Sequence, residues 1–165
     1  MDKIKVKDSR MYSLIYLYDI HTNYFARVIA GISDKDVQNR LNTKANHIAW
    51  ITGSLVHERF EIANALGIQL KQTSDELFKN HKGIQDNIKY PSLTEFKKDW
   101  ETISPVLRNA LSEISEAKLN GKFDMGGEQM TYFDLIAFIT YREASCIGQI
   151  ALYRRLLGYE AMKYD

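Results

Sequence analysis

The chain has only two prolines, Pro91 and Pro105, in 165 residues. Proline removes a backbone N–H donor and clashes inside a helix, so the long proline-free stretches permit long helices. Most of the glycines stand where an apolar pattern of helical spacing stops, which is a common place for a helix to end. The strict alternation of apolar and polar residues that is typical of half-buried strands is nearly absent. The sequence therefore predicts an all-α fold.

Four stretches have the apolar spacing of a long amphipathic helix. The first covers about residues 9–30, and the second begins near Thr43 and ends at Leu66, before Gly67. The third begins after Ser92 and the fourth after Thr131, because each of these residues is followed three positions later by an acidic residue, as in a capping box. We expect the third helix to end near residue 120, with Pro105 kinking or breaking it, and the fourth to end near residue 157.

The connections between these helices differ in length and composition. Residues 31–41 are expected to form a turn with a short helical piece, because Ser33 and Asp36 have capping-box spacing. Residues 68–91 are polar and the least periodic, which indicates a long crossover with one short helix, and residues 121–133 are expected to form a hairpin or loop. We therefore predict a single domain over residues 1–165, a four-helix bundle with a long crossover between helices two and three.

Composition excludes several classes of function. The 22 Lys and Arg balance 21 Asp and Glu, without the basic face that nucleic-acid binding requires. A single cysteine cannot form an intramolecular disulfide, so a cytoplasmic protein is expected. The first 30 residues imitate a signal peptide, but Asp19 interrupts their short apolar run. No stretch reaches the 18 apolar residues of a membrane span, so we expect neither a nucleic-acid partner nor a membrane.

The common catalytic motifs are missing from the sequence: there is no phosphate-binding glycine loop, no G-x-S-x-G, no Cys-x-x-Cys and no H-E-x-x-H. The four histidines are His21, His47, His57 and His81, and no two of them are three or four residues apart. No single helix therefore offers a pair of histidines to a metal.

Two segments carry a family resemblance. "ANHIAWITGSLVHERFEIANALG" and "FITYREASCIGQIALYRRLLG", with "YPSLTEF" between them, resemble the DinB/YfiT superfamily of bacterial four-helix-bundle proteins over essentially the whole chain. In the last helix, similar members read H-E-x-x-H-x-G-Q and then R-R-x-x-G. In helix two, the family pattern of an aromatic residue followed four positions later by histidine falls on Trp50 and Ser54.

The resemblance implies an up-down-down-up bundle that is often a homodimer. Family members typically hold a divalent metal such as zinc or nickel with three histidines from helices two and four, and in some members this site serves thiol transfer or hydrolysis. The three ligand positions fall on Ser54, Arg142 and Cys146 of this chain, and none is a histidine. A guanidinium is always protonated and has only N–H donors, so it cannot be a ligand. We therefore expect no metal and no other cofactor.

Arg142 and Cys146 lie one helical turn apart, so both are expected to face the cleft beside helix two. We interpret Arg142 as occupying the former place of the cation. Its counter-charge is then Glu58, one turn beyond Ser54, or a small anionic ligand. Glu143 should point elsewhere and make a structural hydrogen bond.

The preferred function is a small-molecule binding or interaction module that is dimeric and has no metal. The alternative is a metal- or thiol-dependent transferase or hydrolase that uses Cys146 and non-standard ligands such as His47, two turns before Ser54. A neighbouring arginine would make the Cys146 thiol more reactive, whereas an apolar surrounding would make it a packing residue. Trp50 is expected to support the cleft by close helix packing.

Overall fold

Four long helices dominate the computed structural model, which describes residues 4–124, 126–127 and 129–165. They are α1 (Met11–Ile29), α2 (Ile48–Ala65), α3 (Leu93–Ser112) and α5 (Tyr132–Leu156). The smaller elements are a 3-10 turn, η1 (Asp75–Leu77), the short helix α4 (Glu116–Asn120), and the strands β1 (Lys122–Asp124) and β2 (Gln129–Thr131). The fold is therefore mostly helical, as the sequence predicts.

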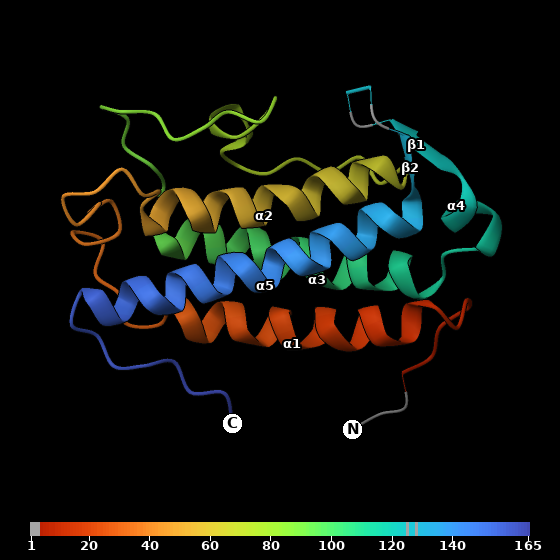
Figure 1. The fold of residues 1–165 in the computed structure, drawn as a ribbon, viewed down its shortest axis with the longest axis horizontal. Helices are drawn as coiled ribbons and strands as arrows, with labels where there is room; N and C mark the ends of the chain where they lie inside the picture. Colours follow the sequence, from red (N-terminus) through yellow and green to blue (C-terminus); the bar gives the residue numbers. More distant parts are fainter. Residues whose placement is uncertain (1–3, 125, 128) are drawn as a thin grey trace.

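The four long helices lie side by side around one core (Figure 1). α1 and α5 run in one direction, and α2 and α3 run in the opposite direction. α1 packs against α3 and α5, and α2 packs against the same two helices. Because α2 and α3 are parallel neighbours, the chain returns along the whole bundle between them, and residues 66–92 form this crossover.

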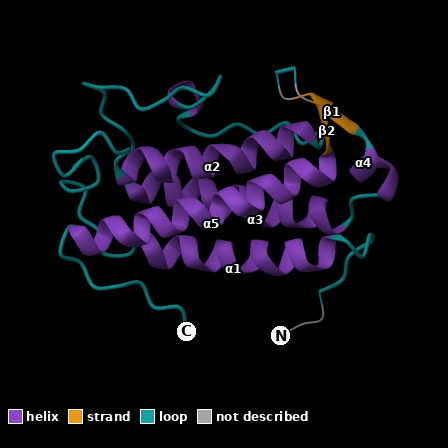
Figure 2. Cartoon of the chain, in the orientation of Figure 1, coloured by secondary structure: helices purple, strands orange, loops and turns teal. Residues whose placement is uncertain are grey.

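The strands form a small antiparallel hairpin at one end of the bundle (Figure 2). β1 pairs with β2 in the register Lys122 with Thr131, Phe123 with Met130 and Asp124 with Gln129. β2 runs directly into α5, so the hairpin is anchored to the start of that helix. The predicted hairpin or loop is thus a hairpin.

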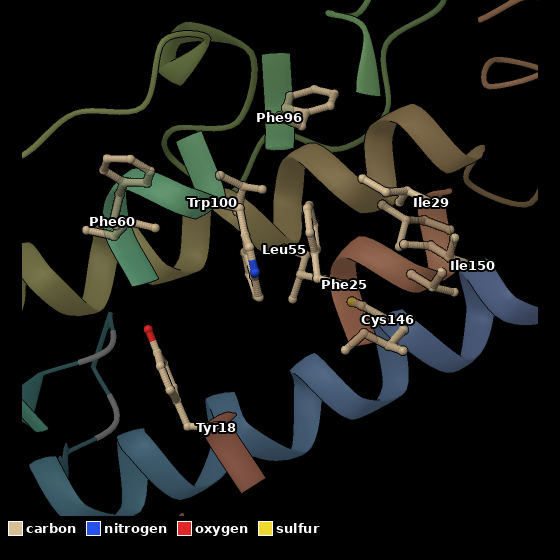
Figure 3. Close-up of a cluster of buried hydrophobic side chains, with 14 of the residues drawn as sticks. Tyr18, Phe25, Ile29, Leu55, Phe60, Phe96, Trp100, Cys146 and Ile150 are labelled. Atoms are coloured by element: carbon tan, nitrogen blue, oxygen red, sulfur yellow. The ribbon is translucent and has the colours of Figure 1, made fainter. Parts of the chain in front are cut away.

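Aromatic and aliphatic side chains from all four long helices fill the core (Figure 3). The rings of Phe25 and Trp100 are stacked, with their centroids 4.2 Å apart. Leu55 and Ile150 are fully buried near this stack, and Met11 and Ile15 are fully buried further along α1. Burial of side chains of this size, at roughly 1.5 to 3 kcal/mol each, is the main force that holds the helices together.

Two of the three predicted capping boxes are present. The Ser92 hydroxyl accepts from Glu95 N and the Glu95 carboxylate accepts from Ser92 N, and Thr131 and Asp134 repeat the arrangement at the start of α5. Ser33, by contrast, starts no helix: residues 34–38 form turns, with Asp36 N donating to Ser33 O at 2.9 Å.

Two predicted boundaries are wrong, and of the kink or break predicted at Pro105 the break is wrong. α2 begins at Ile48 rather than near Thr43, because His47 is its N-cap and accepts through Nδ1 from Trp50 N at 3.1 Å. α3 ends at Ser112, and Ser115 then caps the separate helix α4. Pro105 does not interrupt α3, since the carbonyl that it leaves without a partner belongs to the exposed Glu101, where water can reach it.

α5 is long enough and apolar enough, by length and composition alone, to cross a membrane. A core helix of a soluble protein meets the same criterion. In this fold α5 packs against α1, α2 and α4.

Candidate ligand-binding cleft

A cleft of about 560 Å³ lies between α2 and α5, and the crossover and the hairpin complete its walls. Its apolar lining comes from all four of these segments: Trp50, Ile62, Phe78, Phe123, Leu135 and Phe138. Its polar lining is concentrated on the two helices: Ser54, His57, Glu58, Glu61 and Arg142. A concave, mostly apolar site with a few polar groups is the usual form of a small-molecule site.

The polar side of the cleft is built by helical spacing. Trp50, Ser54 and Glu58 follow one another at intervals of four on α2 and so share one face. Arg142 reaches this face from α5: its Nε lies 2.6 Å from Glu58 Oε1, and its Nη2 donates to Ser54 Oγ at 3.1 Å. The predicted ion pair between Arg142 and Glu58 is therefore confirmed.

The carboxyl group of Glu58 is held in an unfavourable place for a charge. Burial raises the pKa of Glu58 to about 7, the positive charge of Arg142 opposes this shift, and the nearby Glu143 and Glu61 add to it. Glu58 therefore binds a proton at a much higher pH than an exposed glutamate does, although a cation lies beside it.

Several polar atoms of the cleft have no hydrogen-bond partner in the protein. In the described part of the chain, buried atoms of this kind on lining residues are Trp50 Nε1, His57 Nδ1 and Glu58 Oε2. A buried donor or acceptor that stays unpaired costs about 1 to 3 kcal/mol. A ligand that pairs with Trp50 Nε1 and Glu58 Oε2 would recover part of that cost.

Cys146 and His47 lie outside the cleft lining. Cys146 packs with the apolar core and is 7 % exposed, and Figure 3 shows it beside α1. Burial raises the pKa of the Cys146 thiol to about 11, with a further contribution from Glu58, and outweighs the lowering effect of Arg142. Of the two readings of Cys146, a reactive thiol or a packing residue, the structure supports the packing residue, and the expectation that its side chain faces the cleft is wrong. His47 caps α2, and its ring meets Tyr90 edge-on at 5.0 Å.

Glu143 points away from the cleft and into the bundle, as predicted. Its carboxylate binds the guanidinium of Arg59 on α2 through two bonds, Nε to Oε1 at 2.6 Å and Nη2 to Oε2 at 3.0 Å. Its Oε2 also lies 3.1 Å from Nδ1 of His21 on α1. The guanidinium of Arg59 is fully buried and lies over the ring of Trp100 at 3.5 Å.

Two adjacent positions on each helix thus form two ion pairs of opposite polarity. Toward the cleft, α2 supplies the acid (Glu58) and α5 the base (Arg142). Toward the core, α2 supplies the base (Arg59) and α5 the acid (Glu143).

The sequence did contain a signal for the core pair that our prediction missed. Arg59 falls between Leu55 and Ile62 on the apolar face predicted for helix two, and His21 falls between Tyr18 and Phe25 on that of helix one. A charged residue within an apolar row indicates a buried ion pair, because an unpaired charge there is very costly. The contributions of Phe78 and Phe123 to the cleft have no comparable local signal.

The residues at the three positions of the family metal site do not fit a divalent metal. Arg142 provides only N–H donors and a positive charge, and Ser54 Oγ already accepts from it. Only Cys146 could offer a strong ligand, and its thiol is held in the protonated form at neutral pH. Among the residues that the structure describes, no group of three or more His, Cys, Asp or Glu side chains is placed to hold a metal ion.

Comparison with known proteins does not assign a family: no protein-family model matches this sequence, and no curated protein matches it either. The resemblance to the DinB/YfiT superfamily stays a prediction. A function for this protein is therefore inferred from its own cleft.

Proposed function

We propose that this protein is a DinB-like bundle that binds a small organic molecule in the cleft between α2 and α5, and that it does so without a metal. One observation carries this proposal: Trp50 and Glu58 line a mostly apolar cleft of ligand size, and a buried donor of the first, Nε1, and a buried acceptor of the second, Oε2, have no protein partner. Pockets with a few unpaired polar groups among apolar walls are suited to small ligands.

Two features of the fold support the DinB-like part of the proposal. The directions of α1, α2, α3 and α5, with a crossover between α2 and α3, are those that the resemblance implies. Ser54 and Arg142, which are 88 residues apart and match two positions of the family metal site, are hydrogen-bonded to each other. A wrong alignment would bring these positions together only by accident.

The cleft ion pair supports the metal-free part. A guanidinium supplies one fixed positive charge to Glu58 and needs no ligands of its own. In this proposal the guanidinium of Arg142 takes the place of the metal ion that the resemblance implies. Elemental analysis of protein purified without chelators tests this point, and a stoichiometric transition metal would contradict it.

A homodimer is the partner that we propose, on the resemblance and on the exposed aromatic residues of α1. Tyr12 is 52 % and Tyr16 44 % exposed, whereas Tyr24 packs edge-on against Tyr164. Exposed aromatic side chains are enriched at interfaces. Light scattering should give twice the 19.1 kDa mass of the chain, and a purely monomeric species at working concentrations would contradict the proposal.

The binding function can be tested with the two tryptophans of the chain, whose indole N–H signals are visible by NMR. Trp50 lines the cleft, whereas Trp100 Nε1 donates to Thr22 O in the bundle. A fragment screen should yield molecules that shift the Trp50 signal and leave the Trp100 signal in place.

A filled cleft provides the matched comparison. Ala65→Trp places a large ring in the cleft, and Ala26→Trp places the same ring in a separate groove between α1 and α3. Fragments should bind the wild type and Ala26→Trp but not Ala65→Trp. Fragments that bind Ala65→Trp unchanged, or a complete lack of fragments that shift Trp50, would refute the proposal.

A further inference from the structure

We propose that the cleft selects organic amines, molecules with an aromatic or branched apolar body and a protonated amine that docks on the Glu58 carboxylate. This inference rests on the proposed function, because it names the ligand class of the same cleft.

The first argument is the free oxygen of Glu58. Glu58 is only 8 % exposed and lines the cleft, and while Oε1 pairs with Arg142, Oε2 has no partner. In its ionised form, which prevails above about pH 7, the carboxylate only accepts hydrogen bonds, so the group that then satisfies Oε2 must be a donor. Rotation about the last side-chain bond is soft, so the carboxylate can turn Oε2 toward a ligand. An ammonium group has three N–H donors and the complementary charge.

The second argument is that Arg142 is already engaged. Its Nε is held by Glu58 and its Nη2 by Ser54. An anionic ligand would have to compete with a 2.6 Å ion pair for the guanidinium and would meet the Glu58 carboxylate beside it. The arrangement therefore disfavours binding of a small anion, which the sequence analysis gave as the alternative to Glu58 as the counter-charge of Arg142.

The third argument is the charge at the rim of the cleft. Glu61 and Asp124 are exposed carboxylates at the rim, while the ammonium of Lys82 donates to the backbone oxygen of Glu76 at 2.8 Å. With Glu58 and Arg142 included, the lining holds three carboxylates and two cations. Without the lining histidines His57 and His81, three carboxylates and two cations leave one net negative charge, which weakly favours a cation and is screened by salt.

The fourth argument concerns the body of the ligand. Trp50, Phe78, Phe123 and Phe138 give the cleft aromatic walls on α2, the crossover, the hairpin and α5. Aromatic faces attract both apolar groups and a nearby ammonium. The free Trp50 Nε1 donor can in addition bind an oxygen acceptor of the same ligand.

Three probes of similar size, with the same phenyl ring but a different polar end, distinguish a cationic, a neutral and an anionic ligand: phenethylamine, phenethyl alcohol and phenylacetate. Titrations at pH 8, followed through the Trp50 indole signal, should show phenethylamine binding at least about tenfold more tightly than phenethyl alcohol, with phenylacetate weakest. Glu58→Gln should lower the affinity for the amine about tenfold and leave that for the alcohol in place. Glu101→Gln, an exposed change of the same kind on α3, should alter neither.

The pH dependence is a second measurement that needs no variant. Groups that lie around Glu58 are Arg142, Glu143 and Cys146 on α5, His57 and Glu61 on α2, His81 and Lys82 in the crossover, and Asp124 in the hairpin. The pKa of Glu58 is about 7, so the carboxylate form increases between pH 6 and pH 8. Affinity for the amine should rise over this range, and Glu58→Gln should remove most of that rise. This result would show that the pH dependence comes from Glu58 and not from His57 or His81.

The outcomes distinguish this inference from the proposed function. Equal affinity for the amine and the alcohol would overturn the amine inference, and so would an amine affinity that does not respond to pH or to Glu58→Gln. Either result is compatible with fragment binding in the cleft, and therefore with the proposed function. Tightest binding of phenylacetate would overturn it in favour of an anion. Loss of all fragment binding would instead refute the proposed function itself.

Discussion

Arg142 on α5 and Glu58 on α2 form an ion pair across the cleft, with Nε 2.6 Å from Oε1. The two residues differ in their contact with water, since 37 % of the Arg142 side chain is exposed but only 11 % of the Glu58 side chain. The arginine therefore keeps much of its hydration while the carboxylate loses most of its own. This asymmetry explains why the pKa of Glu58 is raised despite the adjacent cation.

Replacing Arg142 by alanine should destabilise the protein by an amount that depends on pH. At pH 8 the buried Glu58 carboxylate would lose its counter-charge, at a cost of about 1 to 3 kcal/mol. The pKa of Glu58 in the fold, about 7, lies above the ordinary value of 4.5. The native state therefore holds the proton more tightly, and the stability that this provides is full below about pH 4.5 and is lost as the pH rises through 7. At pH 5.5 the variant should thus lose less stability.

Urea denaturation at the two pH values measures the difference. Arg155→Ala removes an exposed arginine in the last turn of α5; it is the control and should change the free energy of unfolding by less than about 0.5 kcal/mol at either pH. An equal cost of Arg142→Ala at pH 5.5 and pH 8 would show that Glu58 does not titrate in this range.

Replacing Glu143 by glutamine should cost far more than breaking a surface ion pair. The variant leaves the guanidinium of Arg59, which is fully buried, without its counter-charge, and such losses cost about 3 to 5 kcal/mol. Asp19→Asn is the comparison, because Asp19 and Arg108 make an equally short pair of 2.6 Å with side chains that are 34 % and 40 % exposed. That change should cost less than about 1 kcal/mol. Similar denaturation midpoints for the two variants would contradict the prediction.

Gly53→Ala should destabilise the bundle although alanine is the better helix former. A Cβ at Gly53 would lie 2.7 Å from Cζ of Phe96 and closer still to Cζ of Phe78, so both rings would have to move. Overpacking of this kind costs about 1 to 3 kcal/mol. At Gly148 in α5 a Cβ would meet nothing within 4 Å, so Gly148→Ala should stabilise by up to about 1 kcal/mol. Thermal unfolding should therefore shift in opposite directions for the two variants.

Histidines at the three family positions should create a metal site. Ser54→His, Arg142→His and Cys146→His together remove the guanidinium charge and supply three imidazole ligands from α2 and α5, as a catalytic zinc site uses. The folded triple variant should bind zinc or nickel by calorimetry and melt at a higher temperature in its presence. Wild type should show neither effect. A folded triple variant that binds neither metal would mean that the side chain at position 146, which packs in the core of the wild type, does not reach the other two, or that the resemblance is out of register.

Local signals in the sequence located some helix ends and missed others. In the capping boxes at Ser92 and Thr131, both hydrogen bonds join residues only three positions apart, so the local sequence is sufficient to predict them. At Thr43 the same residue type misleads, because its hydroxyl donates to Arg40 O and accepts from Ala45 N, which makes a turn before the helix. The break after Ser112 is hidden, since Ile114 and Leu119 remain buried and continue the apolar pattern.

The candidate site was predictable where it depends on spacing along one helix. Four-residue intervals put Ser54 and Glu58 on one face, and the family positions put Arg142 opposite them. Cys146 could not be placed in the same way, because whether its side chain enters the cleft or the core depends on how α5 is rotated. The crossover and hairpin walls, such as Phe78 and Phe123, depend on contacts between distant segments that no local pattern encodes.

The opposite polarity of the two ion pairs between α2 and α5 distinguishes the observed packing from its alternatives. Successive side chains on a helix point about 100° apart. Turning α5 by that angle to bring Glu143 into the place of Arg142 would set it against Glu58, and two carboxylates would meet in a poorly hydrated site. Two adjacent charges of opposite sign on each helix thus specify the rotation of α5 about its own axis. Apolar packing brings α5 against α2, and the order of the charges determines which side of α5 faces the core.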